Sequence, residues 1–236
     1  QMAAKRMLSN ISHDLKTPMT VILGYLEILR LKEGKELPLL EKVEAKAHDV
    51  MELIQQFFTL AKLEAGDTSL ELTSVPVNEV CRENVLDFYE LLTRKQFEVE
   101  LRIPETPIYA HANREALKRI LSNLISNAIR YGSAGKYLGV FLRADQAAVY
   151  IDIVDKGRGI QKEFADRIFD RLFTMDDARC SQTQGNGLGL TIARNLAWQL
   201  GGDITLESRP FQKTTFTVRL TRIPYVAQTI LEERNS

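Results

Sequence analysis

Two long apolar stripes with a helical period, both in the first 64 residues, restrict the fold more than any other feature. A glycine and a proline in the segment KEGKELP separate the stripes. The pattern predicts an amphipathic helix over residues 4–32 and a second over residues 40–61, joined into an antiparallel hairpin. The first stripe consists of Leu8, Ile11, Leu15, Met19, Ile22, Leu26 and Leu29. The second consists of Leu40, Val43, Ala47, Val50, Ile54, Phe57 and Ala61.

A helical hairpin by itself buries only one stripe of each helix. Pairing two hairpins into a four-helix bundle covers both stripes, so the pattern favours a homodimer. The segment EAGDTS at residues 64–69 combines a glycine with polar residues and predicts a hinge before a second domain. We therefore expect a helical hairpin over residues 1–66, a second domain over 67–222 and a C-terminal tail over 223–236.

In the second domain, strand patterns alternate with helix patterns, which predicts an α+β fold with one mixed sheet layered against helices. The polar stretch 174–187 lacks periodicity and predicts a mobile loop. We expect strands near 70–73, 97–103, 107–110, 137–144, 148–154, 203–208 and 214–220. We expect helices near 77–94, 113–131, 161–168 and 188–200.

The composition excludes several classes of protein. Of the 236 residues, 44% are hydrophobic and 26% charged, as in an ordinary soluble globular protein. The 31 basic residues balance the 31 acidic ones, which gives no indication of nucleic-acid or membrane-surface binding. Cys81 and Cys180 lie far apart without a CxxC pair, so we expect free thiols in a reducing cytoplasm and no zinc site. No apolar run approaches the roughly 18 residues that span a bilayer, and the start at Gln1 in helical sequence suggests a piece of a longer protein.

The segment SNISHDLKTPMTVILGYL at residues 9–26 places polar residues on the first helix. On a helical wheel His13 lies about 140 degrees from the apolar stripe and Thr17 about 180 degrees, so both are expected to face solvent. Pro18 crowds the turn of Asp14 at a cost of roughly 3 kcal/mol. A neutral imidazole can act as a nucleophile, and the adjacent carboxylate can hold its tautomer. The segment predicts a reactive histidine, with an ordinary surface histidine as the alternative.

The segment ILSNLISNAIRYG at residues 120–132 places Asn123 and Asn127 on one helical face, with Arg130 on the same flank. Asparagine is a mediocre helix former, so two at the edge of an apolar stripe need a reason. An amide oxygen suits Mg²⁺, and Arg130 would then face phosphates. The alternative is a pair of polar boundary residues.

The segment VYIDIVDKGRGI at residues 149–160 runs a strand into Asp155, followed by Gly157 and Gly159. An ionised carboxylate only accepts hydrogen bonds, so it can receive one from an amino group such as adenine N6. The glycines allow the backbone to approach a flat ring. The alternative is an ordinary turn.

The segment GNGLGLTIA at residues 185–193 places Gly185, Gly187 and Gly189 directly before a helix. Free backbone amides and the helix dipole form a phosphate cradle there. The spacing matches neither a dinucleotide fingerprint nor a P-loop, and the alternative is a flexible turn.

The segment IFDRLF at residues 168–173 lies between the two glycine motifs. It is predicted to place Phe169 and Phe173 on one helical face, as an apolar anchor for the loop that follows. Such a loop could close over a nucleotide as a lid.

In this order the motifs resemble the five conserved boxes of sensor histidine kinases, over residues 5–221. SHDLKTP resembles the H box, NLISNAIRY the N box, DKGRGI the G1 box, IFDRLF the F box and GNGLGL the G2 box. The resemblance implies a dimerisation and phosphotransfer hairpin followed by an α/β sandwich ATP-binding domain of the Bergerat type. It also implies autophosphorylation by Mg·ATP and transfer of the phosphoryl group to an aspartate of a response regulator. The parent protein would reach a membrane only through segments upstream of this chain.

By position, the resemblance implies that His13 is the phosphoacceptor, Asp14 the assisting acid/base and Thr17 the residue associated with dephosphorylating the partner. Asn127 matches the Mg²⁺ ligand and Asp155 the adenine anchor. The chain carries Asp14 where the family often has glutamate. The remaining nucleotide contacts would be Asn123, Arg130, Tyr131, Gly157, Gly159, Gly185, Gly187, Leu188 and Gly189.

Two other classes of function stay open at this point. An ATP-driven conformational clamp would hydrolyse ATP without forming a phosphoprotein and would give His13 no role. A non-catalytic dimeric scaffold would not need Asn127, Asp155 or the glycines.

Overall fold

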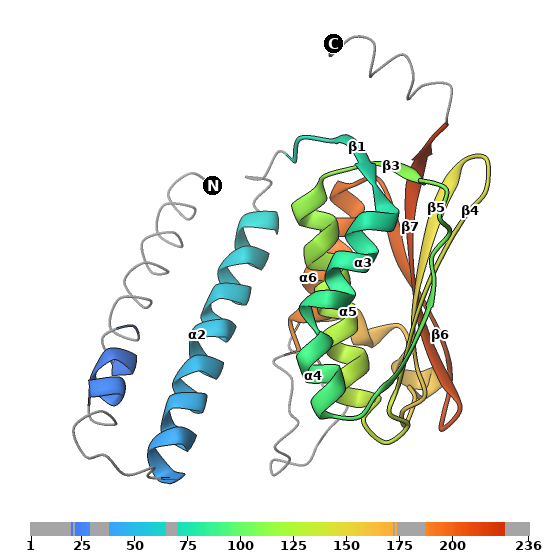
Figure 1. The fold of residues 1–236 in the computed structure, drawn as a ribbon. Helices are drawn as coiled ribbons and strands as arrows, with labels where there is room; N and C mark the ends of the chain where they lie inside the picture. Colours follow the sequence, from blue (N-terminus) through green and yellow to red (C-terminus); the bar gives the residue numbers. More distant parts are fainter. Residues whose placement is uncertain are drawn as a thin grey trace. The chain divides into compact units, whose positions relative to one another are not determined.

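The computed structural model describes residues 20, 22–28, 38–64, 70–171, 173 and 187–224. The chain divides into two compact units, residues 1–68 and 69–236 (Figure 1). The first unit is helical where it is described, and the second contains the sheet.

The main element of the first unit is helix α2, Pro38–Glu64, which confirms the second predicted helix. Of the first predicted helix, residues 20 and 22–28 are described and are helical. Along α2, Ala47, Phe58, Leu60 and Leu63 are buried. A second stripe with seven-residue spacing is exposed; it consists of Val43, Val50 and Phe57. None of the helices in the described part of the chain is long and apolar enough to cross a membrane.

The second unit is built on a mixed seven-stranded sheet with the order β1-β3-β7-β5-β4-β2 and β6 paired to β7. The strands β2 and β4 pair in parallel, and the other pairs are antiparallel. The long strand β7 pairs with β5 along one edge, and with β6 and then β3 along the other. The strands are β1 Thr73–Pro76, β2 Glu98–Arg102, β3 Tyr109–Ala112, β4 Tyr137–Ala144, β5 Ala148–Asp155, β6 Asp203–Arg209 and β7 Lys213–Ile223.

Helices cover one face of this sheet (Figure 1). They are α3 Val77–Asp87, α4 Tyr89–Arg94, α5 Arg114–Tyr131 and α6 Gly189–Gln199. Alternate residues of β5 and β7 are buried, as expected for strands with one face on the core. The face of α5 toward the core is buried as well; it consists of Leu117, Ile120, Leu121, Leu124 and Ile125. The α+β fold predicted from the sequence is confirmed.

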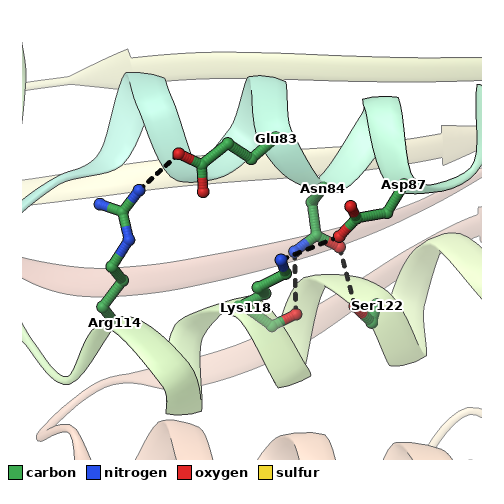
Figure 2. A network of polar contacts seen from close by, with 6 residues as sticks. All are labelled: Glu83, Asn84, Asp87, Arg114, Lys118 and Ser122. Carbon is green, nitrogen blue, oxygen red and sulfur yellow. Dashed lines mark hydrogen bonds and ion pairs between the residues drawn. The ribbon is translucent and has the colours of Figure 1, made fainter.

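Polar contacts fix the position of α3 on α5 (Figure 2). The buried Asn84 donates from Nδ2 to the carbonyl oxygen of Lys118 (3.1 Å) and accepts from Ser122 Oγ (2.9 Å). Two ion pairs flank it: Arg114 with Glu83 (2.6 Å), and Lys118 with Asp87 (3.0 Å). Because a buried amide must keep its partners, this network sets the register of α3 along α5.

Three predicted elements needed correction. The helix predicted over 77–94 is two helices, because the backbone of Phe88 leaves the helical region at φ −99° and ψ 3°. The helix predicted over 161–168 is two short 3₁₀ turns, η1 Lys162–Phe164 and η2 Arg167–Phe169. The strand predicted over 70–73 is shifted, since β1 begins at Thr73, opposite Ala112.

The remaining predicted elements are confirmed with ends within three residues, except for the helix predicted over 4–32, whose ends lie outside the described residues. The predicted mobile loop lies outside the described residues apart from Gly187, and so does the tail beyond Pro224. Cys81 is buried, and its burial raises the pKa of the thiol to about 12, so this thiol stays protonated. Cys180 lies outside the described residues.

Candidate active site

A pocket opens in the second unit beside the C-terminal half of α5. It encloses about 540 Å³ when the space of its open mouth is included. Residues from α5, the end of β5, η2, the start of α6 and β7 line it. They are Asn127, Tyr131, Asp155, Gly159, Ile160, Ile168, Phe173, Leu190, Thr214 and Phe216.

Asp155 ends strand β5 and is the one carboxylate among the lining residues. Its side chain is buried, and the N–H of Gly157 donates to Oδ1 at 2.8 Å. Burial raises the pKa of Asp155 to about 6, against the opposing effect of that hydrogen bond. The pocket therefore contains a carboxylate that is ionised at neutral pH and accepts from the N–H of Gly157. An amino group of a ligand could donate a further hydrogen bond to it.

Glycine is required in the loop after Asp155 because other backbone lies very close. A Cβ on Gly157 would lie 2.2 Å from the carbonyl oxygen of Tyr131. Gly159 has a φ of +75°, and its Cβ would lie 2.6 Å from Cα of Pro210. The loop is thus packed tightly between the end of α5 and the hairpin that joins β6 to β7, with no room for a side chain at either glycine.

Hydrogen bonds hold the same loop to this hairpin. The N–H of Ile160 donates to Ser208 Oγ at 2.9 Å, and Ser208 Oγ lies 3.0 Å from Thr214 Oγ1. The N–H of Phe211 donates to the carbonyl oxygen of Arg158 at 3.0 Å. The rim of the pocket at Gly159 and its wall at Thr214 are therefore connected through Ser208.

Polar side chains form a row along α5. Asn127 and Tyr131, one turn apart, line the pocket. Asn123 lies one turn earlier and faces the start of α6, where a Cβ on Gly189 would come within 3.3 Å of its Oδ1. The row therefore leads from the pocket to the free amides at the N-terminus of α6. Arg130 is half-buried on the same helix but is not among the lining residues.

The second glycine motif is described only from Gly187 onward. Gly187 has a φ of +65°, and Leu188 is buried at the N-terminus of α6, where its carbonyl oxygen accepts from the N–H of Ile192. Gly185 lies outside the described residues, as do His13, Asp14 and Thr17.

The sequence analysis missed several wall residues: Ile160, Ile168, Leu190, Thr214 and Phe216. A signal for Thr214 existed, because the alternation of TTFTVRL places Thr214 and Phe216 on the face of Val218 and Leu220. A hydroxyl side chain at one of these buried and otherwise apolar positions indicates that a polar group is needed at that place.

The predicted shared helical face of Phe169 and Phe173 was wrong. The turn η2 ends at Phe169, and the next residue, Asp170, is extended with a ψ of 148°, so the turn of Phe169 does not continue as a helix to Phe173. Phe169 packs edge-on against Phe216, with ring centroids 6.3 Å apart. Phe173 lies 5.9 Å from the ring of Phe164 and lines the pocket.

The lining fits an adenine nucleotide. Apolar side chains offer flat contact to a ring, and the buried Asp155 offers an acceptor for an exocyclic amino group. No group of three His, Cys, Asp or Glu side chains that could hold a metal occurs among the described residues. A magnesium ion held mainly by phosphates and water, with one amide oxygen from α5, is compatible with this donor set.

Two families match this chain. Residues 112–223 match the family described as histidine kinase-, DNA gyrase B- and HSP90-like ATPase. Residues 3–66 match the His Kinase A (phospho-acceptor) domain. The fold, the pocket and the first match define an ATP-binding domain, and the second match places a phosphoacceptor domain before it.

Curated relatives agree with this class. The sensor histidine kinase YcbM of Bacillus subtilis is 44% identical over 95% of this chain and 74% of its own length. The signal transduction histidine-protein kinase ArlS of Staphylococcus haemolyticus is 30% identical over 91% of this chain, which spans 48% of that relative. This chain belongs to the sensor histidine kinases of two-component systems, and it is an ATP-dependent protein-histidine kinase core.

Solved structures share the fold. Full-length ShkA in complex with AMPPNP has a TM-score of 0.75 at 23% identity, covering 93% of this chain and 46% of ShkA. The histidine kinase AdeS of Acinetobacter baumannii has a TM-score of 0.66 at 26% identity, covering 90% of this chain and 98% of that one.

Proposed function

We propose that this chain uses Mg·ATP to phosphorylate its own His13 and then passes the phosphoryl group to an aspartate of a response regulator. The observation that carries the proposal is the buried Asp155 carboxylate in an otherwise largely apolar pocket. In this proposal residues 1–66 form the dimerisation and phosphotransfer domain, residues 67–222 the ATP-binding domain and residues 223–236 a tail.

In the second unit, adenine occupies the pocket with its N6 amino group donating to Asp155. Gly157 and Gly159 let the backbone pass close to the ring, and Tyr131 contributes a wall. The phosphates then run along α5 toward its N-terminal half.

At the phosphate end, the contacts come from two elements. Asn123 on α5 and the residues of the second glycine motif meet the phosphates; the latter are Gly185, Gly187, Leu188 and Gly189. The short distance between Gly189 and Asn123 supports this direction. Asn127 would hold Mg²⁺ through its amide oxygen, and Arg130 on the same helix would add positive charge.

The transfer proceeds by attack of a His13 ring nitrogen on the γ-phosphorus. An N–P bond forms, the bond between phosphorus and the β,γ-bridging oxygen breaks, and ADP leaves. Asp14 accepts the proton of the other ring nitrogen and keeps the attacking nitrogen unprotonated. Magnesium supplies neutralisation of charge on the phosphates. Thr17, four residues after His13 in the sequence, orients the water that hydrolyses the phosphoaspartate of the partner.

The exposed stripe on α2 supports a homodimer. Val43, Val50 and Phe57 are 43, 43 and 51% exposed in the single chain, at the spacing of a coiled-coil seam. Pairing with a second hairpin would remove these side chains from water.

Incubation with γ-labelled ATP and Mg²⁺ tests the proposal. We expect label on the chain that is acid-labile and base-stable, as in a phosphohistidine. His13→Gln and Asp155→Asn should both abolish the label. His48→Gln is the matched control, because His48 is an exposed histidine on α2 outside the five motifs and should leave the label unchanged.

Two results would contradict the proposal. ATP hydrolysis without a labelled chain would favour the conformational clamp, and absence of Mg·ATP binding would favour the scaffold. Transfer is tested separately by adding an isolated receiver domain and following the label from His13 to that domain.

A further inference from the structure

Arg194 on α6 lies outside the five motifs, and its guanidinium group contacts side chains from three elements: Phe169 of η2, Trp198 of α6 and Asp203 of β6. Arg194 Cζ lies 4.5 Å from the ring centroid of Phe169 and 4.9 Å from that of Trp198. Arg194 Nε lies 3.4 Å from Asp203 Oδ1, which also accepts from Trp198 Nε1 at 3.0 Å. We name Arg194, Trp198 and Asp203 the Arg194 cluster.

The cluster is connected to the nucleotide pocket through Phe169. This residue belongs to η2, a turn of only three residues with little backbone hydrogen bonding of its own to fix it. Thr191 Oγ1 on α6 donates to the carbonyl oxygen of Phe169 at 2.9 Å, and the ring of Phe169 packs on Phe216. Ile168, the neighbour of Phe169, and Phe216 both line the pocket.

We propose that Arg194 is a positioning residue for nucleotide binding: it clamps the Phe169 ring against α6 and thereby holds the Ile168 and Phe216 wall of the pocket in place. This inference rests on the proposed function, since it assigns that wall to adenine. The clamp has two sides, because Thr191 holds the backbone of η2 while Arg194 holds its side chain.

The planarity of the guanidinium is essential to this role. An arginine can stack on two aromatic rings while its edge meets a carboxylate, whereas a lysine ammonium is a compact, strongly hydrated charge. Arg194→Lys therefore keeps the ion pair with Asp203 but loses the stacking on Phe169. Arg194→Met keeps much of the stem volume and loses both contacts.

The test measures the Kd for Mg·ATP by calorimetry, and the phosphorylation rate at saturating ATP, in residues 1–236. Arg194→Met should raise the Kd about tenfold, as loss of a partly desolvated cation–π contact and its ion pair predicts. The saturated rate should change less than twofold, because bound nucleotide is still correctly placed for transfer. Arg194→Lys should give an intermediate Kd.

The chain offers a matched control and a spectroscopic readout. Arg114→Met removes another half-exposed arginine of the same unit, paired with Glu83 on the side of α5 that meets α3, and should leave the Kd unchanged. Trp198 is the only tryptophan of the chain. Its fluorescence should change when Mg·ATP binds to the parent sequence and should not change in a folded Arg194→Met variant.

If Arg194→Met fails to fold, Asp203→Asn replaces it, since asparagine keeps an acceptor for Trp198 but removes the charge that holds Arg194. This variant should raise the Kd about threefold, because the loss of a partly exposed ion pair has a small effect and leaves both ring contacts of Arg194 in place. The inference would be overturned if the Kd for Mg·ATP were unchanged in the Arg194 and Asp203 variants. It would also be overturned if Arg114→Met raised the Kd as much as Arg194→Met does. Both results would leave the proposed function standing. Failure of the parent sequence to bind Mg·ATP would overturn the proposed function and the inference with it.

Discussion

Asp155 and Thr214 lie directly opposite each other where β5 pairs with β7, and both side chains are buried in the same pocket. Residues opposite each other in an antiparallel ladder project to the same face, so the sheet itself places a hydroxyl beside the carboxylate. Ser208 then connects Thr214 to the glycine loop that follows Asp155. The polar end of the pocket is thus held by three strands, while its apolar walls come from helices and turns.

Asp155→Asn should stabilise the free chain and weaken its nucleotide binding. The folded pKa of about 6 lies above the usual 3.8, so ionisation of Asp155 at neutral pH costs on the order of 2 to 3 kcal/mol. Asparagine removes that cost and can still accept from the N–H of Gly157. Its affinity for Mg·ATP should fall about a hundredfold, since a mismatched buried polar pair costs roughly 1 to 3 kcal/mol. Urea unfolding and calorimetry at pH 7 measure both effects.

Asp152→Asn is the control for this substitution. Asp152 lies on the same strand but bonds Arg143 (3.2 Å) and Thr217 (2.6 Å) and does not line the pocket. It should leave nucleotide affinity unchanged. A destabilised Asp155→Asn chain that still binds Mg·ATP would contradict the assignment of Asp155.

The contribution of Asp155 to the stability of the free chain should decrease as the pH rises from about 4 to about 6. Because the pKa of Asp155 is raised by folding, the folded state binds more protons than the unfolded state in this window. The stabilising contribution of the protonated Asp155 is fully present below its unfolded pKa of 3.8, and it is lost as the pH rises through its folded pKa of about 6. The difference in unfolding free energy between the parent sequence and Asp155→Asn isolates it, and a difference independent of pH from 4 to 7 would exclude it.

Adenosine should bind more weakly as the pH falls through about 6. The protonated carboxyl of Asp155 has lost much of its capacity to accept from the adenine amino group. Adenosine tests this hydrogen bond more directly than ATP does, because it carries no phosphate group that titrates near pH 6. Binding should release protons near pH 6, which calorimetry in buffers of different ionisation enthalpy detects. Affinity that is constant from pH 5 to 8 would argue against a hydrogen bond to Asp155.

Gly157→Ala should destabilise the second unit by several kcal/mol and prevent nucleotide binding. The new Cβ would lie 2.2 Å from the carbonyl oxygen of Tyr131 and 2.8 Å from Cα of Gly132, so backbone must move. Gly201→Ala provides the comparison, since Gly201 has a φ of +71° but no atom within 4 Å of its added Cβ. It should cost about 1 kcal/mol from backbone strain and leave the Kd intact. Equal effects of the two substitutions on binding would contradict this account.

The sequence predicted the central strands well because their pattern is local. Residues 137–144 and 148–155 are short, mostly apolar runs, and this local pattern suffices to place β4 and β5. The end of β5 also located Asp155 and the glycines after it. Asn123 and Asn127 could be placed because α5 has a continuous apolar stripe that fixes its orientation.

The errors arose where tertiary contacts decide the local structure. The break at Phe88 and the two 3₁₀ turns before Phe173 have apolar spacing compatible with a helix, so periodicity alone cannot detect them. The Arg194 cluster joins α6 to Asp203 on β6 and to Phe169 on η2. No sequence pattern connects these positions, because only the packing of η2 on α6 brings them together.

Val50→Glu should weaken self-association of the chain. Val50 is the middle residue of the exposed stripe on α2, and a carboxylate there would have to be desolvated in a paired bundle. Gln55→Glu adds the same charge at an exposed position of α2 outside that stripe. Light scattering during size-exclusion chromatography should show a smaller mass for Val50→Glu at micromolar concentration and no change for Gln55→Glu.

Because autophosphorylation requires His13 within reach of a bound ATP, Val50→Glu should also slow labelling while leaving the Kd of the isolated pocket for Mg·ATP unchanged. A dimer unaffected by Val50→Glu would place the association surface elsewhere on the chain.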